Sequence, residues 1–116
     1  MTLDAIIEKY GMHDLEIGKC KKTENGVTVY AYCHKHNVDG EFMVNYNLKI
    51  EGDFRIIELN ADDENDIYID IARIEKLGDG TYEVGGAGDW LHFEVLGDLT
   101  VTEISDEEYE TVTKGI

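Results

Sequence analysis

The stretch VTVYAYCHKHNVDGEFMVNYNLKI, residues 27–50, decides the fold, because it contains two alternating runs separated by one turn signal. Apolar and polar residues alternate on both sides of Asp39-Gly40, and Asp-Gly in this setting favours a two-residue hairpin turn. The turn predicts three cross-strand pairs: Cys33 with Tyr46, Ala31 with Leu48, and Val29 with Ile50. We therefore expect a hairpin with one buried face and one outer face.

A second hairpin is expected directly before the first. Residues 15–22 supply the additional strand, and Asn25-Gly26 is another signal for a two-residue turn. This turn places Cys20 opposite Ala31 and Glu16 opposite Lys35. Both registers predict the same buried face, made of Val27, Val29, Ala31, Cys33, Phe42, Val44, Tyr46, Leu48 and Ile50. Leu15 and Ile17 fall on the opposite face, so we expect a bulge in the first strand or a cover over it.

Further elements on both sides complete the domain. Thr2 as N-cap and Gly11 as C-terminal stop predict a helix over residues 2–10. The capping box Ser105-Asp106-Glu107-Glu108 predicts a short second helix to about residue 114. Five more strands are expected, at 54–60, from 67 to 75 or 76, and at 81–84, 90–95 and 99–104. The sequence thus predicts a single α+β domain, residues 1–116, with an N-terminal helix, a short C-terminal helix and an antiparallel sheet of about 6–8 strands, curled or barrel-like.

Negative charge is the strongest compositional signal. The chain has 26 acidic and 10 basic residues, a net charge of −16. Residues 1–50 hold 7 acids and 6 bases, whereas residues 51–116 hold 19 acids and 4 bases, so the second part carries −15 of the total. Such a chain is repelled by nucleic acid and by anionic membranes and is attracted to basic surfaces. With neither a signal peptide pattern nor a long apolar run, we expect a cytoplasmic protein.

The acids predict a surface that binds a basic protein. In size and composition the chain resembles the small acidic inhibitors encoded by phages and mobile elements, of the anti-CRISPR or nucleic-acid-mimic type. This resemblance implies a partner that is itself a nucleic-acid-binding enzyme, with carboxylates placed where the enzyme binds phosphates. The residues expected at this surface are Asp62, Asp63, Glu64, Asp66, Asp70, Glu83, Glu94, Glu103, Asp106, Glu107, Glu108 and Glu110.

Two alternative functions remain open on the sequence alone. An immunity protein that neutralises a toxin nuclease would use the same electrostatics against a different partner. A small-ligand-binding domain would instead use the outer hairpin face, where Tyr30, Tyr32, His34 and His36 alternate with buried residues. Exposed sheet edges would also allow a homodimer.

No motif predicts catalysis, a cofactor or a metal site. The acids at 62–66 lack the Gly and Glu of a calcium loop, and His34 with His36 would need a third ligand. The glycine-rich stretch 85–88 is followed by neither a helix nor a Lys-Ser/Thr pair, which argues against a phosphate loop. Cys20 and Cys33 are expected to be free thiols in the core. We therefore expect a binding protein and not an enzyme.

Overall fold

The computed structural model describes residues 1–11, 15–23, 26–36, 43–60, 67–88 and 90–113, and it confirms the α+β class. The elements in chain order are α1 (Leu3–Tyr10), β1 (Leu15–Thr23), β2 (Gly26–His36), β3 (Met43–Gly52), β4 (Phe54–Asn60), β5 (Ile67–Gly78), β6 (Thr81–Gly88), β7 (Trp90–Val95), β8 (Thr100–Glu103) and α2 (Asp106–Thr113). Neither helix of this described part has the length and apolar character needed to cross a membrane.

Both helices begin at the residues that the sequence predicts. The side chain of Thr2 accepts a hydrogen bond from the Ala5 amide (3.2 Å), and Gly11 ends α1 in the left-handed conformation with φ 62°. Ser105 Oγ accepts a hydrogen bond from the Glu108 amide (3.1 Å) at the start of α2. Side-chain acceptors and a left-handed glycine satisfy backbone groups that a helix end leaves unpaired.

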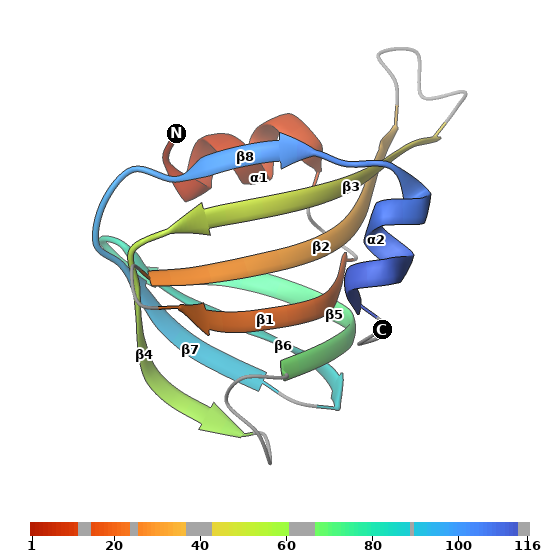
Figure 1. Ribbon diagram of the computed structural model, residues 1–116. Helices are drawn as coiled ribbons and strands as arrows, with labels where there is room; N and C mark the ends of the chain where they lie inside the picture. The colour runs from red at the N-terminus through yellow and green to blue at the C-terminus, as the bar shows by residue number, and fades with distance from the viewer. Residues whose placement is uncertain (12–14, 24–25, 37–42, 61–66, 89, 114–116) are drawn as a thin grey trace.

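The strands form one antiparallel hydrogen-bonded series in the order β4-β7-β6-β5-β1-β2-β3-β8. This sheet curls strongly, so that β4, β7 and β6 lie across the core from β2 and β3, and the paired strands β5 and β1 join the two parts (Figure 1). It is not closed into a barrel, because within the described ranges no pairing joins the end strands β4 and β8. The prediction of a curled antiparallel sheet is therefore confirmed, without barrel closure.

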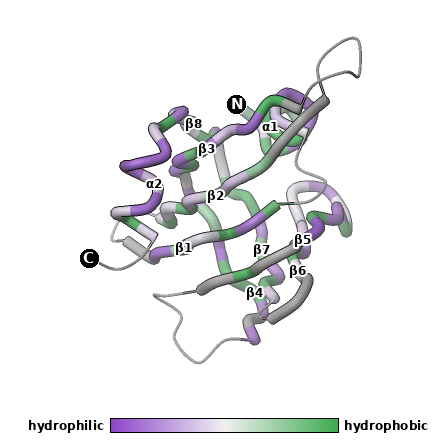
Figure 2. The backbone as a smooth tube through the Cα atoms, turned by 90° about the vertical axis from the view of Figure 1, so that its right-hand side faces the viewer, coloured by the Kyte–Doolittle hydropathy of each residue, from purple (hydrophilic) through white to green (hydrophobic). Residues whose placement is uncertain are grey.

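The core lies between the two parts of the curled sheet and is covered at one side by α1. Ile6 and Tyr10 of α1 are buried, and the Tyr10 ring meets the Tyr46 ring edge to face at 4.9 Å. Apolar and polar segments alternate along the strands (Figure 2). In β7, for example, the buried Leu91 and Phe93 alternate with the more exposed Trp90 and His92, so one face of the strand lies against the core.

The register predicted for the hairpin of β2 and β3 is confirmed. Cys33 pairs with Tyr46, Ala31 with Leu48, and Val29 with Ile50. The predicted burial extends less far than expected, because Val44 is 41% exposed. Val44 lies toward the end of the hairpin, beyond the part covered by the core. The predicted turn at Asp39-Gly40, and Phe42, lie outside the described residues.

The register predicted between β1 and β2 is wrong. Cys20 pairs with Val29 and not with Ala31, and Glu16 pairs with Tyr32 and not with Lys35. The cause lies partly in Gly26, which pairs with Thr23 and whose missing side chain leaves room for the backbone of Gly52. Because Gly26 pairs with Thr23 and so belongs to the strand, Cys20 meets Val29 instead of Ala31, and the close approach to Gly52 on the β3 side needs glycine.

A bulge in β1 resolves the placement of Leu15 and Ile17. The register between β1 and β2 shifts between Ile17 and Lys19, so that Ile17 pairs with Ala31 and turns to the core. Both Leu15 and Ile17 are buried. The expected bulge is thus confirmed, because one extra residue reverses the faces of the residues before it.

Candidate partner-binding surface

A line of three glutamates and one histidine crosses the outer face of four neighbouring strands. Glu75 of β5 pairs with Glu83 of β6, Glu83 also lies opposite His92 of β7, and His92 lies opposite Glu58 of β4. Paired residues of antiparallel strands project to the same side of a sheet. We call Glu58, Glu75 and Glu83, with His92 among them, the glutamate row.

The row sets Glu75 and Glu83 directly opposite each other, and Arg73, two residues before Glu75 on the same face of β5, is the base beside this pair. All three glutamates are exposed, and among the residues that the structure describes none of them forms an ion pair. Like charges directly opposite on a sheet are destabilising. The Nε2 atom of His92 is buried and has no hydrogen-bond partner within the described residues. The row thus consists of three exposed glutamates outside any ion pair of the described residues, with a partly buried histidine between Glu83 and Glu58.

The next cross-strand pair shows a different arrangement. Glu94 of β7 pairs with Arg55 of β4, and its Oε1 accepts from Arg55 Nε at 3.2 Å and lies 3.0 Å from Nη2. The sequence predicts Glu94 as part of the acidic surface, but its charge is compensated by this arginine. Glu94 therefore belongs to the edge of the surface and contributes less net charge than the row.

A second acidic group lies on α2. This helix packs on the outer face of the other sheet part, where Tyr109 is buried and its hydroxyl donates to Glu16 Oε1 at 3.0 Å. Asn47 donates a side-chain hydrogen bond to Asp106, so this acid also has a structural role. Asp106, Glu107 and Glu108 occupy the first helical turn, where the helix dipole stabilises negative charge.

The predicted acids are thus divided between two outer faces and an edge. Glu83 and Glu94 lie on β6 and β7, whereas the exposed acids Asp106, Glu107, Glu108 and Glu110 lie on α2. Glu103 is exposed on the end strand β8. Asp62, Asp63, Glu64 and Asp66 lie outside the described residues, as does the side chain of Asp70, whose backbone belongs to β5.

Sequence reasoning missed Glu58 and Glu75 as members of the acidic surface. The short turn at 78–80 contained a signal for Glu75, because a hairpin centred there sets Glu75 opposite Glu83. Glu58 had no such signal, because β4 lies beside β7, which follows it only after two other strands. Its position depends on the order of strands in the complete sheet.

The alternative ligand face is partly covered by α2. Tyr30 and Tyr32 are half-buried, and the Tyr32 ring centroid lies 6.4 Å from that of Tyr109. His34 and His36 belong to β2, but their side chains lie outside the description. Within the described part of the chain, no group of three or more His, Cys, Asp or Glu is placed to hold a metal ion.

Both cysteines are buried, as the sequence predicts. They are free thiols, and burial raises the pKa of Cys20 and of Cys33 to about 12, because the apolar surroundings disfavour the thiolate. A protonated, buried thiol is a poor nucleophile. The structure therefore supports a packing role for both residues.

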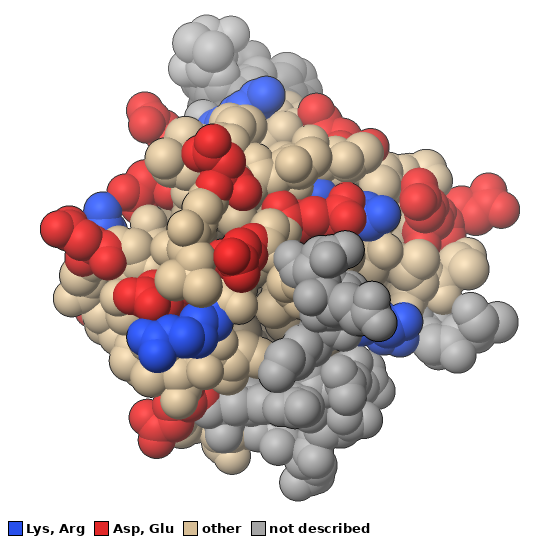
Figure 3. Space-filling model, turned by 60° about the vertical axis from the view of Figure 1, so that its left-hand side comes forward, with Lys and Arg blue, Asp and Glu red and all other residues tan. Residues whose placement is uncertain are grey.

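Acidic side chains are spread over the side of the molecule shown in Figure 3, and Lys and Arg occur there in fewer places. Comparisons with protein-family models, with curated proteins and with solved structures find no match.

Proposed function

We propose that the protein binds a basic protein through its acidic surface, and that the partner is a nucleic-acid-binding enzyme whose groove the carboxylates occupy. The glutamate row is the observation that supports this function. Solubility needs acidic residues on the surface but does not need them opposite one another, where repulsion opposes folding. A destabilising arrangement at an exposed position is typical of a surface retained for binding.

The spacing of the row suits a groove that binds phosphates. Neighbouring strands lie about 4.8 Å apart, so the backbones of Glu75 and Glu83 are separated by about that distance, and the backbone of Glu58 lies about twice as far from that of Glu83. Nucleic acid likewise presents negative charges in a line at separations of several ångströms. The net charge of −16 adds long-range attraction, which accelerates the encounter with a basic surface.

A partner-capture and competition experiment tests this function with two matched variants. The parent chain is immobilised, and a protein that it captures from the source organism is purified. We then measure how well the parent chain displaces this captured protein from a labelled nucleic-acid duplex, from about 0.1 M to about 1 M salt. The row variant carries Glu58→Gln, Glu75→Gln and Glu83→Gln. The helix variant carries Glu107→Gln, Glu108→Gln and Glu110→Gln, so both variants change the net charge from −16 to −13.

The row variant is expected to associate about tenfold or more slowly than the parent, with a smaller effect for the helix variant. It should also unfold at the same or a higher urea concentration, because it loses the repulsion between Glu75 and Glu83. Equal slowing in both variants would assign the effect to total charge and overturn the role of the row. A partner that binds equally well at all salt concentrations, or that keeps its duplex, would overturn the proposed function.

A further inference from the structure

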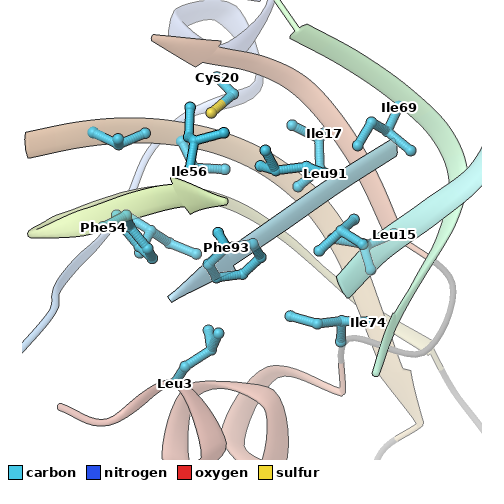
Figure 4. Close-up of a pocket in the computed structure, with 14 residues that line it drawn as sticks. Leu3, Leu15, Ile17, Cys20, Phe54, Ile56, Ile69, Ile74, Leu91 and Phe93 are labelled. Atoms are coloured by element: carbon cyan, nitrogen blue, oxygen red, sulfur yellow. The ribbon is translucent and has the colours of Figure 1, made fainter. Parts of the chain in front are cut away.

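A partly open apolar cavity of about 40 Å³ lies between the two parts of the curled sheet. Figure 4 shows side chains from several elements pointing into it, including Leu3 of α1, Phe54 of β4 and Leu91 of β7. This volume counts the positions open to the centre of a water-sized sphere, so the cavity has room for a molecule larger than one water. This space exceeds the small packing gaps usual in protein cores.

The chemistry of the cavity is uniformly apolar. All the described residues that line it are aliphatic or aromatic, apart from Cys20, whose buried thiol behaves as a small apolar group. Water needs two to four polar partners to occupy a buried site. The lining offers none, so the cavity favours an apolar molecule over water.

The cavity extends to β4, which is an end strand of the sheet that the structure describes. Phe54 and Ile56 of β4 line it, and both are half-buried. Among the described strands, β4 is hydrogen-bonded to β7 alone, so the sheet does not enclose the cavity on this side. Movement of one end strand would therefore admit a small molecule without breaking the central pairs.

We infer that this cavity is a binding site for a small uncharged hydrocarbon of about four non-hydrogen atoms. The site is separate from the glutamate row, because the cavity lies on the inner face and the row on the outer face of the same strands. The inference is thus independent of the proposed partner binding, and either can fail without the other.

Titration with isobutene and acetone tests the site. The two molecules have nearly the same shape, but acetone carries a carbonyl oxygen that would lose its hydrogen bonds to water inside an apolar cavity. Binding is measured from methyl NMR shifts of the full chain. Isobutene should shift the methyl signals of Ile69 and Leu91 saturably, with an affinity about tenfold or more above that for acetone.

Three substitutions of Val by Ile separate cavity binding from general apolar attraction. Val84→Ile and Val29→Ile each add a methylene group to a residue that lines the cavity and are expected to weaken isobutene binding about tenfold or more. Val44→Ile makes the same chemical change at an exposed position and should bind like the parent. The amide spectrum of each variant shows whether it is folded. If one of the two filling variants, Val84→Ile or Val29→Ile, does not fold, the other still tests the site.

Saturable shifts at the lining residues, lost in a folded filling variant and kept in Val44→Ile, would support the site. Shifts that do not saturate, or that occur at the exposed Leu77 and Leu96, would overturn it. Equal affinities for isobutene and acetone, or for the parent and both filling variants, would overturn it as well.

Discussion

The thiols of Cys20 and Cys33 provide a residue-scale test of the core. Because burial raises the pKa of each to about 12, both stay protonated in the native state at pH 8. We expect a thiol-specific reagent to label them slowly without denaturant and rapidly in urea, with Cys20→Ala and Cys33→Ala variants assigning each rate. Rapid native labelling of Cys33 would contradict its burial.

The same pKa shifts have a consequence for stability at alkaline pH. An unfolded thiol ionises near pH 9, whereas the folded thiols ionise only near pH 12. Between these values the unfolded state loses protons that the native state keeps, so the stabilisation present below pH 9 is lost as pH rises. If either cysteine is replaced by alanine, the free energy of unfolding should therefore fall less as pH rises from 9 toward 12.

At the scale of elements, the contact between α2 and β1 depends on Gly18. A Cβ at this position would collide with the Tyr109 hydroxyl and would lie 2.6 Å from the Thr113 methyl group. We expect Gly18→Ala to lower the free energy of unfolding by about 1–3 kcal/mol, as overpacking does in well-packed sites. Urea unfolding measures the effect.

A double-mutant cycle makes this prediction specific. Tyr109→Phe removes the hydroxyl that meets Gly18, so the cost of Gly18→Ala should be smaller in the phenylalanine background. Gly97→Ala is the matched control, because a Cβ there meets nothing within 4 Å and should leave stability nearly unchanged. Strictly additive effects of the two substitutions would contradict a role of the Tyr109 hydroxyl in this cost, because the Thr113 methyl group stays close to Gly18 in both backgrounds.

The elements also show why one register was predictable and another was not. The hairpin of β2 and β3 follows from signals within one short stretch, because turn and alternation agree. The register of β1 depends on the bulge near Gly18, and that glycine faces Tyr109 from the other end of the chain. The same limit applies to the site: Glu83 follows from local alternation, whereas Glu58 requires the complete strand order.

At the scale of the whole molecule, two hydrogen bonds to Asp4 join α1 to the hairpin of β5 and β6, and we call them the Asp4 contact. Asp4 accepts hydrogen bonds from Lys76 Nζ (2.7 Å) and from the Tyr82 hydroxyl (2.9 Å). The hydrogen bond from Lys76, followed by that from Tyr82, lowers the pKa of Asp4 below its ordinary value of 3.8. A lowered pKa favours the ionised carboxyl in the folded state.

The Asp4 contact predicts that the stability of the fold depends on pH in the acidic range. For a carboxyl with a lowered pKa, the stabilisation is present above pH 3.8 and is lost as pH falls through the folded pKa. Asp4→Asn should therefore lower the urea midpoint at pH 7, and its difference from the parent should disappear in strong acid. Asp98→Asn, at an exposed loop position, is the control and should show no such difference at either pH. If the urea midpoint of Asp4→Asn lay equally far below that of the parent at both pH values, the Asp4 contact would not explain the loss.

The central place of β1 also affects how quickly the chain can fold. One neighbour, β2, follows it directly, but the other is β5, so that Ile17 pairs with Ile69. Joining distant segments costs loop-closure entropy before any contact compensates it, and sheets with such pairings fold in milliseconds to seconds. During this interval β1 has one unpaired edge that another chain could occupy. Crowded, newly synthesised copies would therefore be most prone to aggregate before β5 reaches its place.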